Sequence, residues 1–388
     1  MTLPESVHVP GLSGERFFVH YRLLCPEEEG RAKAEDICIE QTIEFPADLA
    51  PAGDIPGHIF GRIESLEPLG NGTFSATISY AVETVGSELT QLLNVIFGNI
   101  SIKPGIRVER IDLPASLLAV FRGPRFGLDG LRERLQVPHR PLLSTALKPM
   151  GLSASALAAL AYQFALGGID IIKDDHGLAD QPFCPFEERV AQCAAAVARA
   201  NRETGLHCIY MPHITAPTDR IVERALFARE AGAGGLLVCP GLAGFDTMRL
   251  LADDDRIALP VMSHPAFIGS YTTSQEHGIA HYALYGQLMR LAGADATIFP
   301  NYGGRFAFSE AECRSIVEGC TVDMGHIRPI VPAPGGGMTL ERIADMSRLY
   351  GQDVIYLIGG GLHRHGPDLV ENARYFARLV QQAEAEGG

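Results

Sequence analysis

The sequence predicts an α/β protein with an N-terminal α+β (ferredoxin-like) domain, residues 1–124, followed by a (β/α)8 TIM barrel, residues 125–388. Three observations predict this architecture. The chain has 388 residues, too many for one ordinary domain but suited to a barrel plus a smaller module. From Leu142 onward, short β-branched runs alternate with longer segments of helical periodicity, as in successive βα units. The strand candidates in this part number eight, which is the number that closes a barrel.

The first 124 residues have a different pattern. Apolar and β-branched residues predict strands over 17–24, 37–45, 73–82 and 108–113, and helical spacing predicts a helix over 87–97. Interleaved elements of this length favour a sheet with helices on one face. The Gly- and Arg-rich stretch 121–130 is the expected connection to the barrel.

The barrel part offers a complete set of strand candidates and recognisable helix starts. Pro185, followed by Glu187 and Glu188, marks the start of one helix, and Ser309 before an acidic pair marks another. An open doubly wound sheet is the alternative, but no GxGxxG motif supports a dinucleotide fold. The eight candidate strands cover residues 142–148, 169–174, 207–213, 235–239, 258–264, 295–300, 328–333 and 353–358.

Composition narrows the class of function. The formal net charge of -14 argues against nucleic acid or an anionic membrane as a partner, because both are bound through Lys and Arg. The eight cysteines are scattered, with no CxxC pair, and are expected to be free thiols. The start of the chain does not resemble a signal peptide, and no long uncharged apolar stretch follows. We therefore expect a cytoplasmic protein.

Polar residues at the carboxyl ends of barrel strands point into the mouth where catalysis takes place in this fold. Reading only these ends selects a short set of candidates. They are Lys148, the run Lys173, Asp174, Asp175 and His176, then His213, His264, Asn301, Arg305, and the glycine triplets 335–337 and 359–361.

The run from Lys173 to His176 is the sharpest local signal. Strand alternation puts Lys173 and Asp175 on one side, and His176 can swing in at the turn. Lysine, carboxylate and imidazole together suit a divalent metal, with the lysine acting directly or as a carbamate formed from carbon dioxide. The alternative is an ion pair of Lys173 with Asp174 or Asp175 at the rim.

Glycine triplets after the last two strands suggest a phosphate site, since glycine-rich turns expose backbone N–H groups and these loops frequently bind phosphate. Glycine could also simply turn the chain there. Lys148 precedes Pro149, so its backbone is extended and its ammonium group is expected to point into the barrel mouth. The alternative is that Lys148 is an ordinary surface lysine. His213 and His264 could equally be hydrogen-bonded rim residues.

Several ordered stretches then resemble the ribulose-bisphosphate carboxylase large-subunit superfamily, specifically its RuBisCO-like proteins. The resemblance runs over some 300 residues and is nearly end to end. It is carried by GNISIKPGIRVERIDLPASLLAVFRGPRFGLDGL, ALKPMGLS, GGIDIIKDDH, MSHPAF, AGADATIFPNYGGRF, APGGGM and LIGGG, which follow the family's order.

This resemblance implies roles for individual residues. Lys173 would be the carbamylated lysine, with Asp175 and His176 as further ligands of Mg²⁺, Mn²⁺ or another divalent metal. The alternative for His176 is that it turns away from the metal and acts as a base or as a group that orients the site. Lys148 would be the acid/base at the enolising carbon, and His264 would contact substrate. One phosphate would bind at Gly336, Gly359 and Gly360. Asn99 and, more loosely, Glu40 would reach the site from a partner subunit, so the resemblance implies a homodimer or larger assembly.

Departures from the family pattern exclude carbon dioxide fixation. Pro265, Ile298 and Pro334 stand where the carboxylases hold a second phosphate. Arg305 replaces the mobile-loop lysine that assists carbon dioxide addition, and Met150 replaces a second lysine beside Lys148. A carboxylase of a bisphosphate would thus lose essential anchors.

Family members without these features still enolise a ketose monophosphate. In this chain, the resemblance implies that a metal and Arg305 would hold the enediolate. The resemblance implies a sugar-phosphate isomerase of the 5-methylthioribulose-1-phosphate isomerase type, whose substrate has an apolar or small far end. One alternative is a decarboxylase or carbon–carbon hydrolase of a 3-oxo sugar-acid phosphate, of the 3-oxo-isoapionate 4-phosphate type. The other is a non-catalytic binding protein.

Overall fold

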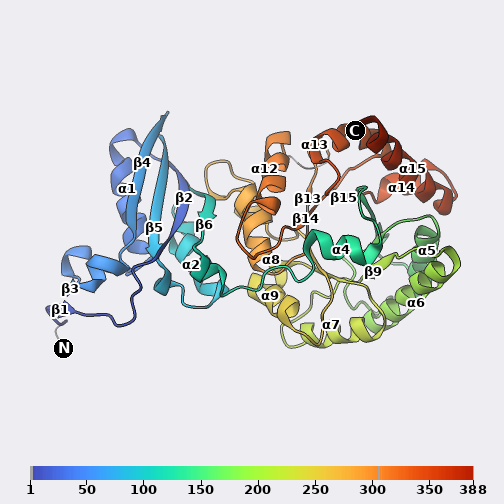
Figure 1. Ribbon diagram of the computed structural model, residues 1–388, viewed down its shortest axis with the longest axis horizontal. Coiled ribbons are helices and arrows are strands. Elements are labelled where there is room, and N and C mark those ends of the chain that lie inside the picture. The colour runs from blue at the N-terminus through green and yellow to red at the C-terminus, as the bar shows by residue number, and fades with distance from the viewer. Residues whose placement is uncertain (1–2, 305, 307, 388) are drawn as a thin grey trace. The chain divides into compact units, whose positions relative to one another are not determined.

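The structure is a computed structural model that describes residues 3–304, 306 and 308–387. Two compact units make up the chain (Figure 1). The first comprises Met1–Phe121, Ile268–Gln287 and Met324–His326, and the second comprises Arg122–Phe267, Leu288–Asp323 and Ile327–Gly388. Within the described ranges, no helix is long and apolar enough to cross a membrane.

The first unit is built on a five-stranded mixed sheet of order β12-β6-β2-β5-β4. The strands β2, β4, β5 and β6 pair antiparallel, and β12, which comes from a later part of the chain, joins parallel to β6. The elements are β1 (Ser6–Val7), β2 (Arg16–Leu24), α1 (Gly30–Glu40), β3 (Ala52–Gly53), β4 (Arg62–Gly70), β5 (Thr73–Ala81), α2 (Leu89–Phe97), β6 (Ile106–Asp112), α3 (Ala115–Leu118), α10 (Gly269–Thr272) and β12 (Gly278–Ile279).

Alternation along the central strand β2 builds the core of this unit. Phe17, Val19, Tyr21 and Leu23 are buried, and the residues between them are more exposed. The buried face packs against helices, and the Tyr21 hydroxyl donates a hydrogen bond of 2.8 Å to the carbonyl oxygen of Ile96 in α2. The predicted strands at 17–24, 73–82 and 108–113 and the predicted helix at 87–97 are confirmed, with ends that differ by a few residues.

The strand predicted over residues 37–45 is wrong, because residues up to Glu40 belong to helix α1. The period-two spacing of Ile37, Ile39 and Ile43 suggested a strand. Burial instead follows a helical spacing, with Ala34, Ile37 and Cys38 buried. The sheet's second outer strand is β4, which the sequence did not reveal because its side chains are mostly exposed and mix charged with apolar residues, as an edge strand allows.

The second unit is a barrel of parallel strands surrounded by helices (Figure 1). Its strands are β7 (Leu142–Leu147), β8 (Ile171–Asp174), β9 (Ile209–Met211), β10 (Leu236–Val238), β11 (Val261–Ser263), β13 (Ala296–Pro300), β14 (Val331–Gly335) and β15 (Ile355–Leu357). Its helices are α4 (Gly127–Leu135), α5 (Ala154–Leu166), α6 (Phe186–Thr204), α7 (Ile221–Glu230), α8 (Pro240–Ala243), α9 (Phe245–Asp253), α11 (Met289–Leu291), α12 (Glu310–Thr321), α13 (Ile343–Tyr350), α14 (Gly360–His365) and α15 (Leu369–Gly387).

The barrel strands hydrogen-bond in two groups of four, β15-β7-β8-β9 and β10-β11-β13-β14. A parallel bridge between His213 and Leu237 joins β9 to β10. Strand side chains that face inward fill the interior, and α4 closes one end with Leu131 and Leu135. All eight predicted barrel strands are therefore confirmed, each within the range expected or shifted by at most a few residues.

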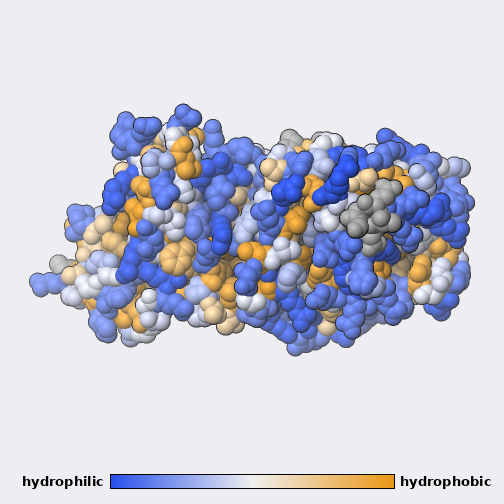
Figure 2. All heavy atoms as spheres, turned by 45° about the horizontal axis from the view of Figure 1, so that its top comes forward, coloured by the Kyte–Doolittle hydropathy of each residue, from blue (hydrophilic) through white to orange (hydrophobic). Residues whose placement is uncertain are grey.

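The two predicted helix starts are confirmed as well. Helix α6 begins directly after Pro185 and carries Glu187 and Glu188 in its first turn. Helix α12 begins after Ser309, whose side chain and that of Glu312 form a reciprocal capping box. Polar side chains cover most of the molecular face drawn in Figure 2, with apolar residues in small groups between them.

Candidate active site at the ends of the barrel strands

Strands β7 and β8 are neighbours, and their carboxyl ends bring together the first two candidate segments. Lys148 directly follows β7, and Asp175 directly follows β8. The Lys148 Nζ atom lies 2.8 Å from Asp175 Oδ1, with side-chain exposures of 39% and 16%. The ammonium group of Lys148 therefore reaches the carboxylate across the open end of the barrel, as strand-end residues in this fold do.

Lys173 lies inside the barrel wall with 2% of its surface exposed. Its Nζ atom donates to the main-chain oxygen of Asp174 at 3.1 Å. Burial, aided by the nearby charge of Lys148 and opposed by that of Asp175, lowers the pKa of Lys173 from 10.5 to about 8. About a tenth of this amine is thus uncharged at pH 7, far more than for an ordinary lysine, and the uncharged form is the one that reacts with carbon dioxide.

Asp175 is held as a carboxylate. Burial opposes its ionisation, but hydrogen bonds from His176 and Lys148 outweigh burial and keep the pKa of Asp175 below its ordinary value. His176 Nδ1 lies 3.4 Å from Asp175 Oδ1. A negatively charged oxygen pair is therefore present beside the Lys173 amine.

His176 and His264 stack face to face, with ring centroids 4.3 Å apart and an interplanar angle of 18°. His264 Nδ1 accepts a hydrogen bond of 3.1 Å from the Ala266 backbone, so in the neutral ring Nε2 carries the proton. Burial, together with the positive charge of Lys173, holds the pKa of His264 well below its ordinary value. The structure thus brings His264 next to the segment that ends β8.

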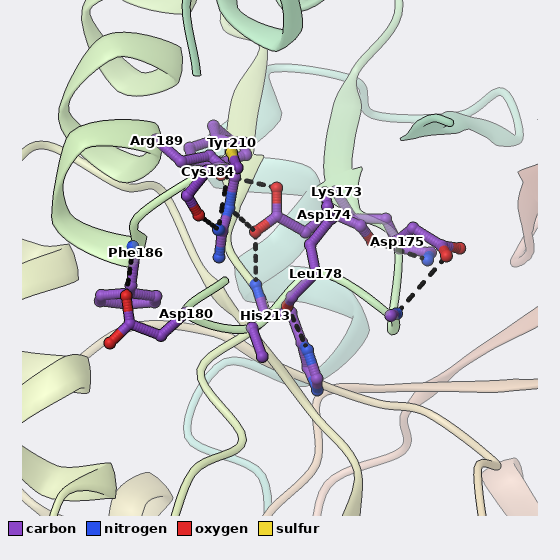
Figure 3. A network of polar contacts seen from close by, with 12 residues as sticks. Lys173, Asp174, Asp175, Leu178, Asp180, Cys184, Phe186, Arg189, Tyr210 and His213 are labelled. Atoms are coloured by element: carbon purple, nitrogen blue, oxygen red, sulfur yellow. Dashed lines mark hydrogen bonds and ion pairs between the residues drawn. The ribbon is translucent and has the colours of Figure 1, made fainter. Parts of the chain in front are cut away.

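Asp174 does not pair with Lys173. Its carboxylate turns away toward Arg189 and Tyr210, while Asp175 turns the opposite way (Figure 3). The alternative in which Lys173 forms a simple ion pair with Asp174 therefore does not describe this structure. Asp174 instead belongs to a buried network behind the barrel wall.

His213 is buried at the end of β9, as strand-end reading predicted, and it has a partner that the sequence did not single out. Its Nδ1 atom lies 2.8 Å from the Leu178 carbonyl oxygen, and its Nε2 atom lies 3.4 Å from Cys239 Sγ. Cys239 is the last residue of the predicted strand 235–239, and its position at a strand end was the available signal. All eight cysteines are free thiols.

The first triplet begins with Gly335, the last residue of β14, and the second triplet makes the turn from β15 into helix α14, whose first residues are Gly360 and Gly361. Gly336 has a φ of +77°, and a Cβ built there would lie 3.0 Å from the Phe306 ring. A Cβ built at Gly359 or Gly360 meets nothing within 4 Å, so the backbone of this turn is open to a ligand. Arg305 lies outside the described residues.

In the first unit, Asn99 and Glu40 are neighbours. Asn99 Nδ2 donates to Glu40 Oε1 at 3.1 Å, and Lys103 Nζ lies 2.8 Å from Glu40 Oε2. The hydrogen bonds from Lys103 and Asn99 lower the pKa of Glu40. The two residues assigned by resemblance to a shared site thus form one polar cluster at the end of α1.

Lysine is used sparingly in this chain. The sequence holds four lysines, Lys33, Lys103, Lys148 and Lys173, although Lys and Arg together number 32. Both lysines of the barrel unit lie at the ends of adjacent strands, in the candidate site. Arginine can replace lysine as a surface cation but not as an amine that gains and loses a proton, so this distribution points to amine chemistry.

A conventional metal cluster is not present in the described ranges, since no group of three or more His, Cys, Asp and Glu side chains could hold an ion. Asp175 and His176 supply two such side chains beside Lys173. A carbamate on the buried Lys173 amine would add the oxygen donors that complete a divalent-metal site.

Fold and strand-end residues together define an α/β barrel protein with a polar mouth. The family model described as "Ribulose bisphosphate carboxylase large chain, catalytic domain" matches residues 127–383. The chain belongs to this family, as a RuBisCO-like protein.

Relatives extend the match over nearly the whole chain. A crystal structure of a Rubisco-like protein from Rhodopseudomonas palustris is similar with a TM-score of 0.85 and 39% identity, covering 95% of this chain and 98% of that one. The 5-methylthioribulose-1-phosphate isomerase of Rhodospirillum rubrum is 36% identical over 96% of this chain and 98% of its own. The 2,3-diketo-5-methylthiopentyl-1-phosphate enolase of Geobacillus kaustophilus is 34% identical over 92% and 90%.

Proposed function

We propose that this protein enolises a ketose monophosphate with the help of a divalent metal and isomerises it by proton transfer, in the manner of a 5-methylthioribulose-1-phosphate isomerase. The observation that carries the proposal is the pairing of the Lys148 amine with Asp175 at 2.8 Å, directly beside the buried Lys173 amine. An amine that carries protons and a site that can hold a cation are the two things enolisation needs.

Lys173, Asp175 and His176 would hold the cation, with Lys173 as a carbamate. Their chemistry fits Mg²⁺ or Mn²⁺, because the carbamate and the ionised Asp175 supply hard oxygen donors. A bound divalent cation would polarise the substrate's carbonyl and hydroxyl oxygens. The lowered pKa of Lys173 favours the uncharged amine from which a carbamate forms.

Lys148 is the proposed proton carrier. Its side chain is part-exposed at the mouth and is oriented by Asp175, so it can remove a proton from a bound sugar and return it to another carbon. His264, held neutral with a proton on Nε2, would donate a hydrogen bond to a substrate oxygen. Arg305 would stabilise the negative charge of the enediolate.

A single phosphate would bind the backbone N–H groups at Gly336, Gly359 and Gly360. The far end of the substrate would be apolar or small. Pro265 and Pro334 lack N–H donors, and Ile298 is a buried apolar side chain in β13. A bisphosphate would therefore find no second anchor, which argues against carbon dioxide fixation.

The names of two relatives support this substrate class, since both specify a 5-methylthio compound with a 1-phosphate. Asn99 and Glu40 of a second copy would complete the site, which makes a homodimer the smallest active form. The hydrogen bond between Asn99 and Glu40 at the end of α1 supports the proposal that both residues act at the same site.

A product assay tests the proposal. Purified protein is incubated with Mg²⁺ or Mn²⁺, bicarbonate and 5-methylthioribulose 1-phosphate, and the products are followed by ¹³C NMR. We expect an isomeric sugar phosphate with no release of carbon dioxide. Carbon dioxide release from a 3-oxo sugar-acid phosphate, with the methylthio compound unchanged, would instead identify a decarboxylase.

A further inference from the structure

The carboxylate of Asp174 is fully buried and receives three hydrogen bonds from different elements (Figure 3). Arg189 Nε of α6 donates at 3.0 Å, the Tyr210 hydroxyl of β9 at 2.7 Å, and the backbone N–H of His213 at 3.0 Å. Asp174 therefore ties the end of β8 to the helix behind it and to the end of the next strand.

Arg189 is as deeply buried as its partner, with no exposed surface. Its Nη1 atom donates to the Cys184 carbonyl oxygen at 3.2 Å, and its guanidinium lies 5.5 Å from the Phe186 ring centroid. Its Nη2 atom is buried without a hydrogen-bond partner among the described residues. The protein therefore leaves one nitrogen of the Arg189 guanidinium without a hydrogen bond.

A buried ion pair of this kind adds little net stability, because the cost of desolvating both charges offsets their attraction. Well-packed apolar residues of similar size often stabilise a fold equally well. The Asp174–Arg189 pair therefore contributes more to geometry than to the free energy of unfolding, because it fixes the orientation of the carboxyl end of β8.

That strand end carries the candidate site. Lys173 and Asp175 flank Asp174 in sequence, and along an extended strand neighbouring side chains point to opposite sides. With Asp174 anchored behind the wall, Lys173 and Asp175 must face the barrel's interior and mouth (Figure 3). The following turn is anchored too, because Asp180 Oδ1 accepts a hydrogen bond of 2.8 Å from the Phe186 backbone at the start of α6.

We propose that the Asp174–Arg189 ion pair positions Lys173 and Asp175 for carbamate formation and metal binding. The inference rests on the proposed function for its metal, but its geometric part concerns this chain's own residues. Asp174 and Arg189 are positioning residues, since neither faces the mouth. Groups that orient metal ligands in this way typically change metal affinity 10- to 100-fold when they are removed.

The same strand offers a matched control at its other end. Asp170, just before β8, forms a two-pronged ion pair with Arg140, with contacts of 2.7 and 2.8 Å, and also accepts a hydrogen bond of 2.7 Å from the Leu143 backbone. Asp170 is 8% exposed. This pair resembles the Asp174 pair in chemistry but lies at the end of the barrel where no site residue is found.

The test compares full-length protein with two double variants, Asp174→Leu/Arg189→Met and Asp170→Leu/Arg140→Met. Both remove a whole ion pair, so neither leaves an unpaired buried charge. Mn²⁺ affinity is measured by electron paramagnetic resonance in bicarbonate buffer. The rate at which cyanate carbamoylates Lys173 relative to Lys33 is measured by peptide mass spectrometry, which needs no metal. Thermal midpoints are recorded for all proteins.

We expect the Asp174 double variant to raise the Mn²⁺ dissociation constant at least about tenfold and to change the Lys173 cyanate ratio at least about threefold. The Asp170 double variant should keep both values within about twofold of wild type, even if its thermal midpoint falls as much as that of the Asp174 double variant. An Asp174 double variant that folds and retains both wild-type values would overturn the proposal.

Two further outcomes are decisive. If the Asp174 double variant does not fold, Tyr210→Phe removes one of the three donors with little loss of volume, and an unchanged cyanate ratio and Mn²⁺ affinity in that variant contradict positioning. If wild-type protein binds no Mn²⁺ while the Lys173 cyanate ratio still depends on Asp174 and Arg189, the metal-dependent function fails and the positioning role stands.

Discussion

The chemistry of single residues is clearest at Lys173. A lysine with 2% exposure and a pKa lowered to about 8 differs from a surface lysine in how its reactivity follows pH. The uncharged fraction of such an amine rises roughly tenfold between pH 7 and pH 9 and then levels off, whereas an ordinary lysine of pKa about 10.5 rises roughly a hundredfold over the same range. The direction is the same, but the shape of the curve is diagnostic.

This difference gives a prediction for the amine itself. The rate constant for acetylation of Lys173 by acetic anhydride, followed by mass spectrometry from pH 6.5 to 10, should rise with the uncharged fraction of the amine and reach a plateau above pH 9. A Lys148→Met variant removes a neighbouring positive charge that lowers the pKa of Lys173, so its midpoint should move to higher pH. A rate that still climbs roughly eightfold between pH 9 and pH 10, as for an ordinary lysine of pKa about 10.5, would show that burial does not perturb Lys173.

Sequence reasoning found the residues at the mouth because their position follows from the fold: Lys148, Lys173, Asp175 and His264 were all placed at strand ends, and the structure has them there. It could not find the contacts that depend on three dimensions. Pairing of Asp174 with Arg189 joins residues 15 apart through a helix packed on a strand, and His213 meets Cys239 across two strands. Neither contact has a local sequence signal.

Among the secondary-structure elements, the barrel strands were predictable because each is a short, largely buried and mainly apolar run between helices. The first unit was harder. Helix α1 carries isoleucines at a strand-like spacing, so the pattern of apolar residues predicted a strand there. The exposed edge strand β4 has no clear apolar pattern, so it was not predicted. Tertiary packing on the sheet decided both.

The turn after β15 allows an element-level test of the phosphate site. Open space surrounds a Cβ at Gly360, so Gly360→Val should fold normally but obstruct a phosphate that approaches the backbone. We expect the Michaelis constant for the sugar phosphate to rise at least about tenfold with a smaller change in turnover, as for lost ground-state binding. The control is Gly57→Val in the first unit, because a Cβ at Gly57 also meets nothing within 4 Å.

Steady-state kinetics and thermal unfolding decide this prediction. A Gly360→Val protein with a wild-type melting temperature and a wild-type Michaelis constant would remove this turn from the phosphate site. A loss of stability shared with Gly57→Val would instead point to a general cost of the added side chain.

For the whole molecule, we propose that this member of the RuBisCO large-chain family retains the residues for enolisation and lacks the anchors for a bisphosphate. The net charge of -14 makes local groups responsible for holding an anionic substrate. The barrel's two lysines, adjacent at one mouth, are the groups on which this claim depends.

Solvent hydrogen exchange tests that claim most directly, because it reports enolisation whatever the final product. Wild-type protein, Lys148→Met and the control Lys33→Met are incubated in D₂O with 5-methylthioribulose 1-phosphate, bicarbonate and Mn²⁺, and deuterium in the recovered sugar phosphate is measured by NMR. We predict rapid incorporation beside the carbonyl by wild type and Lys33→Met, and a rate lower by roughly two to four orders of magnitude in Lys148→Met. Exchange by Lys148→Met at the wild-type rate, or none by wild type with any ketose monophosphate, would contradict the account.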